Sequence, residues 1–178
     1  MSTRGLYTIK GEDGDFNIYK HNDNYPSGAA RTIKLAVDWF AWKLPRYESD
    51  EFATAFVTAC KFGWIEDQKG LMQWYKDYGP QGHYSKYAGG GVRLMPAGNP
   101  TEVASTKCSG IEYRYEISFG TQLPEHIKRR AKKLAPAPVL LIKAFEGSWW
   151  DEPKEYEIFN GPFDDFYKWA LAKDKEVA

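Results

Sequence analysis

Short runs rich in hydrophobic residues, some of them alternating with polar positions, predict a sheet of several strands. The first two runs, residues 6–9 and 16–19, flank a turn-rich segment at 11–15 and predict an antiparallel hairpin. Later runs of the same kind predict strands at 92–94, 111–117, 139–145 and 155–159.

Two of these runs also predict which side chains face the core. Alternation within residues 111–117 places the isoleucines and tyrosines on one face and Glu112, Arg114 and Glu116 on the other. Residues 139–145 form an almost continuous apolar run, which is typical of a strand buried on both faces.

Apolar residues at helical spacing predict a first helix over about 28–43. Ser27 precedes this helix and is placed to cap its first turn with the side-chain hydroxyl, while Pro45 ends it. The buried stripe is predicted to contain Ala30, Ile33, Val37, Phe40 and Leu44.

The same spacing predicts two more helices. One begins at Asp50 or the serine before it and ends at Gly63, with Cys60 as a small core residue on its apolar face. The last begins at Pro162, after a turn at residues 160–161. The element order predicts an α+β fold: a mostly antiparallel sheet, two helices after the first hairpin, and a C-terminal helix packed on one face.

The length of 178 residues suits a single domain spanning 1–178. Two segments interrupt the regular pattern: an aromatic and glycine-rich insertion at 64–91 and a basic segment at 124–138. We expect both to be additions to the predicted α+β core.

Charge and composition narrow the class of function. The chain has 24 basic and 24 acidic side chains, so it has no net field to attract nucleic acid or to imitate it. No apolar run approaches the roughly 18 residues of a membrane helix, and residues 1–10 lack the apolar stretch of a signal peptide. The 2 cysteines are too few for a disulfide framework, so we expect a cytoplasmic protein with free thiols.

Aromatic residues are frequent, with 7 Trp, 12 Tyr and 10 Phe. Most are expected in the core, because each buries a large apolar area. The alternative is an exposed platform for a partner protein or a stacked base, for which Trp149 and Trp150 are candidates.

The polar loop before the first predicted helix is the main candidate site. Free backbone N–H groups at a helix N-terminus favour an anion, and His21 and Asp23 could add a hydrogen bond or a proton. Tyr25, Ser27 and Arg114 complete the predicted ligand-binding set. The alternative is structural: a turn, a packed tyrosine and a helix cap.

Motifs for catalysis or metal binding are weak. The three histidines are isolated, and no two cysteines have ligand spacing, so we expect no metal and no cofactor. No nucleophile elbow is present, although a pair of Cys108 with His21 or His126 stays open. We therefore lean towards a non-catalytic protein.

A basic cluster is the strongest electrostatic feature. It is either a solvated helix face or a contact for phosphate or an acidic protein. We take it, together with Trp149 and Trp150, as the candidate partner-binding set; its members are Lys128, Arg129, Arg130, Lys132 and Lys133.

Three segments together resemble a family of small proteins encoded by phages and prophages. Residues 19–28 resemble its Tyr-x-His-x-Asp-Gly-Tyr-Pro-x-Gly loop, with Asn24 in place of the glycine. Residues 112–115 match its Glu-Tyr-Arg-Tyr strand, and 159–162 its closing Phe-Asn-Gly-Pro. The family is largely uncharacterised, so the resemblance implies a setting in a host cell rather than a reaction.

This setting favours a non-catalytic accessory protein that binds a host protein, for example to antagonise a bacterial defence system. One alternative is a protein that binds or sequesters a nucleotide or other phosphorylated small molecule. The other is a nucleic-acid-binding protein that uses the basic cluster.

Overall fold

The computed structural model describes residues 3–41, 49–61, 91–95, 97–100, 103, 110–120, 139–148 and 154–177. The basic segment, nearly all of the predicted insertion, Trp149 and Trp150, and Cys108 lie outside the described residues. The single-domain organisation of the whole chain therefore stays a prediction.

A mixed six-stranded sheet forms the centre of the described structure, with the order β3-β2-β1-β4-β5-β6. Every neighbouring pair is antiparallel except β1 and β4, which run parallel. The predicted α+β fold with a mostly antiparallel sheet is confirmed. The strands are β1 (Arg4–Ile9), β2 (Phe16–Lys20), β3 (Val92–Met95), β4 (Ile111–Gly120), β5 (Val139–Ser148) and β6 (Lys154–Pro162).

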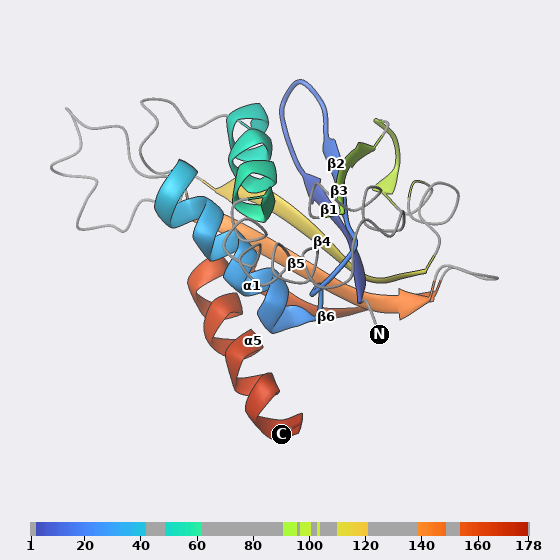
Figure 1. Ribbon diagram of the computed structural model, residues 1–178, viewed down its shortest axis with the longest axis vertical. Helices are drawn as coiled ribbons and strands as arrows, with labels where there is room; N and C mark the ends of the chain where they lie inside the picture. The colour runs from blue at the N-terminus through green and yellow to red at the C-terminus, as the bar shows by residue number, and fades with distance from the viewer. Residues whose placement is uncertain are drawn as a thin grey trace, which may run out of the picture.

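Helices cover one face of this sheet, as Figure 1 shows. Helix α1 (Pro26–Leu35) continues as a π-helical segment, η1 (Ala36–Ala41), and is followed by a helix over residues 49–61. The C-terminal helix α5 (Phe163–Val177) packs on α1. The order of strands and helices thus agrees with the prediction from the hydrophobic pattern.

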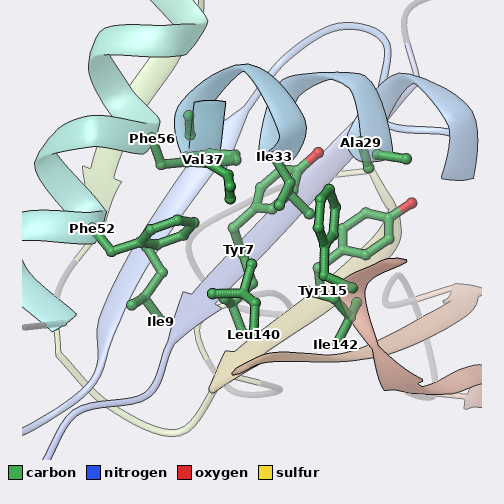
Figure 2. Packing of buried hydrophobic residues seen from close by; sticks show 14 of the residues in the cluster. Tyr7, Ile9, Ala29, Ile33, Val37, Phe52, Phe56, Tyr115, Leu140 and Ile142 are labelled. Atoms are coloured by element: carbon green, nitrogen blue, oxygen red, sulfur yellow. The ribbon is translucent and has the colours of Figure 1, made fainter. Parts of the chain in front are cut away.

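The core lies between the sheet and the helices. Tyr7 of β1 and Tyr115 of β4 are fully buried, and their rings stack with centroids 5.0 Å apart (Figure 2). Phe56, from the helix over 49–61, packs 4.5 Å from Tyr7, and Phe166 of α5 packs 6.0 Å from Tyr115. Aromatic residues therefore join β1, β4 and two helices into one core, as the composition predicted.

A smaller apolar cluster covers part of the opposite face of the sheet. Leu6, Tyr19, Val103 and Ile111 are buried there, with Met95 packed against them. This placement of Ile111 corrects the predicted pattern, which put it on the same face as Tyr115. The pairing of β1 with β4 shifts register between Arg4 and Gly5, so that β4 holds one extra residue and Ile111 turns to the other face.

Strand β5 also differs from its prediction. Its buried residues alternate with exposed ones: Leu140, Ile142 and Ala144 are buried, whereas Leu141 and Lys143 are exposed. The run was apolar, but only its helix-facing side is buried.

The start of the last helix is displaced from its prediction. Residues 160–161 do not form a turn, because Asn160 pairs with Lys143 and Gly161 with Ile142 in the ladder between β5 and β6. Pro162 ends β6, and α5 begins at Phe163 with Asp164 in its first turn. Pairing with β5 therefore prevents the turn that the Asn-Gly sequence predicts.

Candidate functional site

Asn24 holds the loop before α1 against the sheet. It is fully buried, and its Oδ1 accepts a hydrogen bond of 2.7 Å from the Tyr7 hydroxyl. Its Nδ2 lies 2.8, 2.9 and 2.9 Å from the carbonyl oxygens of Thr3, Lys20 and Asn22. Because a buried amide is costly unless it is hydrogen-bonded, these contacts fix the loop in one position.

Asp23 and Lys20 shape the backbone of the same loop. Asp23 has a φ of 55°, in the left-handed region that aspartate adopts more readily than most residues. Lys20 Nζ donates to the carbonyl oxygens of Asn22 and Asp23 over 2.6 and 3.0 Å. Asp23 itself is exposed, so it acts in the loop through its backbone.

His21 lies beside the smaller apolar cluster rather than with the helices. Its Nδ1 is 2.7 Å from the hydroxyl of Tyr19, and the Arg93 guanidinium lies over the Tyr19 ring at 4.7 Å. Burial, followed by the charges of Arg4 and Arg93, lowers the pKa of His21 from its ordinary value of 6.5. The imidazole is therefore largely uncharged at neutral pH.

Ser27 does not cap α1, which corrects the prediction. The helix begins two residues earlier than predicted, at Pro26, with Tyr25 as the N-cap, and no side chain among the described residues bonds to this cap. Ser27 is fully buried, and its Oγ has no hydrogen-bond partner among the described residues. A proline at the first helical position, where no N–H is needed, starts the helix here.

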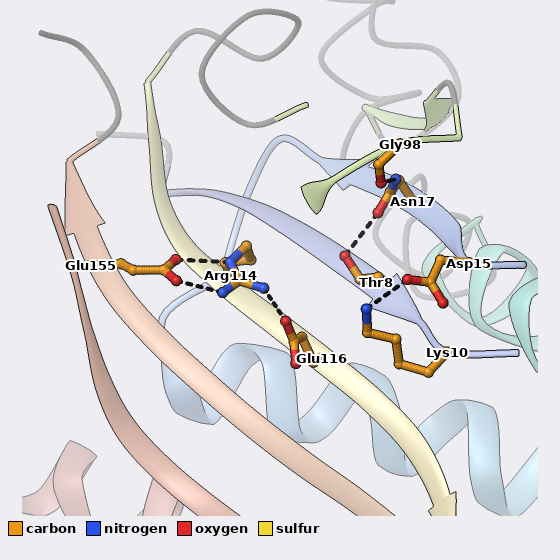
Figure 3. A network of polar contacts seen from close by, with 8 residues as sticks. All are labelled: Thr8, Lys10, Asp15, Asn17, Gly98, Arg114, Glu116 and Glu155. Carbon is orange, nitrogen blue, oxygen red and sulfur yellow. Dashed lines mark hydrogen bonds and ion pairs between the residues drawn. The ribbon is translucent and has the colours of Figure 1, made fainter. Parts of the chain in front are cut away.

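Arg114 is held on the sheet face opposite the helices. Its Nε and Nη2 donate to Glu155 over 2.9 and 2.7 Å, and its Nη1 donates to Glu116 over 2.5 Å (Figure 3). The guanidinium also lies 4.0 Å from the centroid of the Phe145 ring. Because two carboxylates engage its donors, Arg114 links β4 to β6 and does not line the loop site.

The structure therefore separates the five predicted ligand-binding residues. His21, directly after β2, and Arg114, within β4, lie on the face of the sheet away from the helices. Asp23 is exposed and Ser27 is buried. Only Tyr25 lines a hollow described below.

A hollow of about 520 Å³ lies where the first turn of α1 meets the last turns of α5 and the sheet. We call it the main hollow. Ile158 and Ala170 give it an apolar floor, and Tyr25 and Tyr113 give it aromatic walls. The remaining lining residues are Pro26, Glu146, Lys173 and Asp174.

A second hollow of about 460 Å³ adjoins the first and shares two residues with it, Tyr113 and Glu146. We call it the tyrosine hollow; its other lining residues are Glu112, Gly147 and Tyr156. The Tyr113 hydroxyl donates a 3.1 Å hydrogen bond to Glu146 Oε1. Burial, together with the nearby carboxylates, raises the pKa of Tyr113 to about 12, so the phenol keeps its proton and donates.

Sequence reasoning missed Asn24 and Glu146 as residues that build this region. Asn24 occupies a loop position that the family resemblance assigns to glycine, and the two core tyrosines were a signal that a polar partner must be buried with them. Glu146 follows an apolar run, and its place opposite Tyr113 depends on strand pairing that spacing alone does not give.

Within the described residues, no group of three or more His, Cys, Asp or Glu side chains is arranged to hold a metal ion. Cys60 is buried, as predicted, and burial raises the pKa of its thiol to about 12, so this cysteine is a weak nucleophile. None of the helices in the described ranges has the length and apolar character needed to cross a membrane.

Comparison with protein-family models, with curated proteins and with solved structures finds no match to this chain. The resemblance to phage-encoded proteins therefore stays a prediction from the loop and strand motifs.

Proposed function

We propose that this chain is a ligand-binding protein that takes up a small molecule in the main hollow. The observation that carries the proposal is the hollow itself, a space of about 520 Å³ between α1, α5 and the sheet. Small-molecule sites typically span roughly 300–1,000 Å³, so the volume suits one small organic ligand.

The lining of the main hollow supports this proposal. Its floor is apolar, since Ala170 is fully buried and Ile158 packs against the core. Its wall includes Tyr25, which follows directly on the fixed residue Asn24. A wall that is already fixed before binding lowers the entropy lost on association, which favours affinity.

The charges in the hollow bear on the kind of ligand. A phosphate would be favoured by the first turn of α1, whose backbone N–H groups are not capped by any side chain within the described ranges. Glu146 opposes an anion, while Asp174 is compensated by Arg31 at 3.2 Å. A phosphorylated ligand is the alternative, whereas the tyrosine hollow favours a positively charged ligand.

Ligand-observed NMR with a library of nucleotides, amino acids, amines and aromatic acids tests the proposal. The variant Ile158→Trp fills the main hollow from its floor, whereas Leu94→Trp adds the same ring on β3, where Leu94 is 70% exposed. We expect at least one compound to bind the wild type and Leu94→Trp but not Ile158→Trp. Thermal unfolding of both variants checks that each remains folded.

Two results would contradict the proposal. One is that no compound of the library binds the wild type. The other is that Ile158→Trp binds every ligand as tightly as Leu94→Trp does, which would place binding elsewhere.

The prediction that a host protein is the partner rests on the family resemblance and the aromatic excess. Its candidate contact residues, in the basic cluster and at Trp149 and Trp150, lie outside the described residues. It remains compatible with a ligand site, since a phage accessory protein that captures a small molecule would also act on its host. Nucleic-acid binding through the basic cluster stays a further alternative, for which steep salt dependence of binding is the mark.

A further inference from the structure

Two tyrosines and a glutamate form a row across three strands in the tyrosine hollow. The strand register places Tyr113 of β4 opposite Glu146 of β5, and Glu146 opposite Tyr156 of β6. Directly opposed residues of antiparallel strands have Cβ atoms about 4.5–5.5 Å apart, so Glu146 lies between the two tyrosines of this row. Tyr156 is 68% exposed, which leaves its ring accessible to a ligand.

Gly147 allows β5 and β6 to approach closely beside this row. A Cβ atom at Gly147 would collide with the backbone of Lys154 and would lie 2.9 Å from the Cα of Glu155, so a larger residue would push β6 away from β5. The close approach of the two strands is what brings Tyr156 beside Glu146.

The two carboxylates of the tyrosine hollow have no ion-pair partner within the part of the chain that the structure describes; Lys173 lines the adjoining main hollow without pairing with either. Glu146 accepts only the Tyr113 hydroxyl there, and Glu112 has no ion-pair partner. Two other glutamates of the same sheet, Glu116 and Glu155, are both compensated by Arg114. The hollow thus combines two uncompensated negative charges with two aromatic rings.

We infer that the tyrosine hollow binds the cationic group of a small organic molecule, an alkylammonium or a guanidinium, whose apolar body extends into the main hollow. Glu146 and Glu112 offer charge-assisted hydrogen bonds to such a group, and the tyrosine rings offer cation–π contacts. The inference deepens the proposed function and rests on it, because the two hollows adjoin through Tyr113 and Glu146.

The test uses a matched pair of probes, phenethylammonium and its neutral counterpart 2-phenylethanol, with agmatine as a second cation and phenyl phosphate as an anion. Affinities are measured by NMR titration of the full chain, with the Gly147 amide as a reporter of the site. We expect both cations to bind at least about tenfold more tightly than the neutral alcohol.

Two variants and their controls locate the cation. Glu146→Gln removes the charge but keeps the shape and is expected to weaken phenethylammonium about tenfold, whereas Glu157→Gln, an exposed glutamate outside both hollows, leaves it unchanged. Tyr156→Ala is expected to weaken it about threefold or more, and Leu94→Ala, on the other edge strand with a similar exposure of 70%, leaves it unchanged.

The outcomes separate this inference from the proposed function. The inferred cation site is wrong if 2-phenylethanol binds as tightly as phenethylammonium. It is also wrong if Glu146→Gln binds phenethylammonium as tightly as Glu157→Gln does. If phenyl phosphate binds in a way that Ile158→Trp abolishes while neither cation binds, the ligand-binding function stands and the cation inference falls. If no probe and no library compound binds, both are wrong.

Discussion

Tyr115 donates a hydrogen bond of 2.6 Å from its fully buried hydroxyl to the backbone carbonyl oxygen of Asn24. The side chain of Asn24 accepts a second bond from Tyr7, whose ring stacks on that of Tyr115. Burial raises the pKa of both tyrosines well above its ordinary value, so both hydroxyls stay protonated and donate. One loop residue thus joins the core to the wall of the main hollow.

Asn24→Ala is expected to destabilise the protein by about 3 kcal/mol, because it leaves the Tyr7 hydroxyl and several backbone carbonyls without their buried partner. Urea unfolding followed by circular dichroism measures the loss. Asn22→Ala is the matched control, since Asn22 is exposed and contributes only its carbonyl oxygen to this network. Equal stability of the two variants would show that Asn24 does not hold the loop.

Ser27→Ala is expected to leave stability unchanged or to raise it by up to about 1 kcal/mol. The Ser27 hydroxyl is buried and has no hydrogen-bond partner in the part of the chain that the structure describes, so its removal relieves a desolvation cost and breaks no hydrogen bond there. A serine that capped the helix would instead cost about 1 kcal/mol when replaced. Denaturant unfolding distinguishes the two signs, and a loss of that size would restore the role predicted from the sequence.

Arg114→Met is expected to cost about 3 kcal/mol, because it leaves Glu155 and Glu116 without the cation that compensates them in a half-buried site. The control is Arg31→Met, which removes the exposed pair with Asp174 and should cost less than about 1 kcal/mol. Unfolding by urea compares the two. An equal loss of stability in Arg114→Met and Arg31→Met would show that Arg114 does not compensate the two glutamates.

The α+β architecture could be predicted from the sequence because each element carries its own local signal. Alternation marked β2 and β4, and helical spacing marked the buried positions Ile33 and Val37 of the first helix region. These patterns depend only on residues that are close in the sequence, so they can be recognised without the tertiary structure.

The candidate site could be predicted only in part, because it depends on pairing between distant segments. Spacing cannot show that Arg114 would meet Glu155, which lies 41 residues further along the chain. Nor can it show the register shift that turns Ile111 to the far face, or the pairing of Asn160 that removes the predicted turn. Tyr25 was selected as a loop residue, but the hollow it lines is assembled from five separate elements, α1, β4, β5, β6 and α5.

We expect His21 to lower the free energy of unfolding as the pH drops below 6.5. Burial and the charges of Arg4 and Arg93 lower the pKa of His21 in the folded state, so the unfolded chain binds this proton more readily. The stabilisation from His21 is therefore fully present above pH 6.5, the ordinary pKa of histidine. It is lost as the pH falls from that value towards the lower pKa of the folded state. Urea unfolding of the wild type and His21→Gln between about pH 5 and 7.5 isolates this histidine, since carboxylates titrate in both proteins. A titration of the His21 ring by NMR supplies the independent check, and a midpoint at or above 6.5 would contradict the prediction.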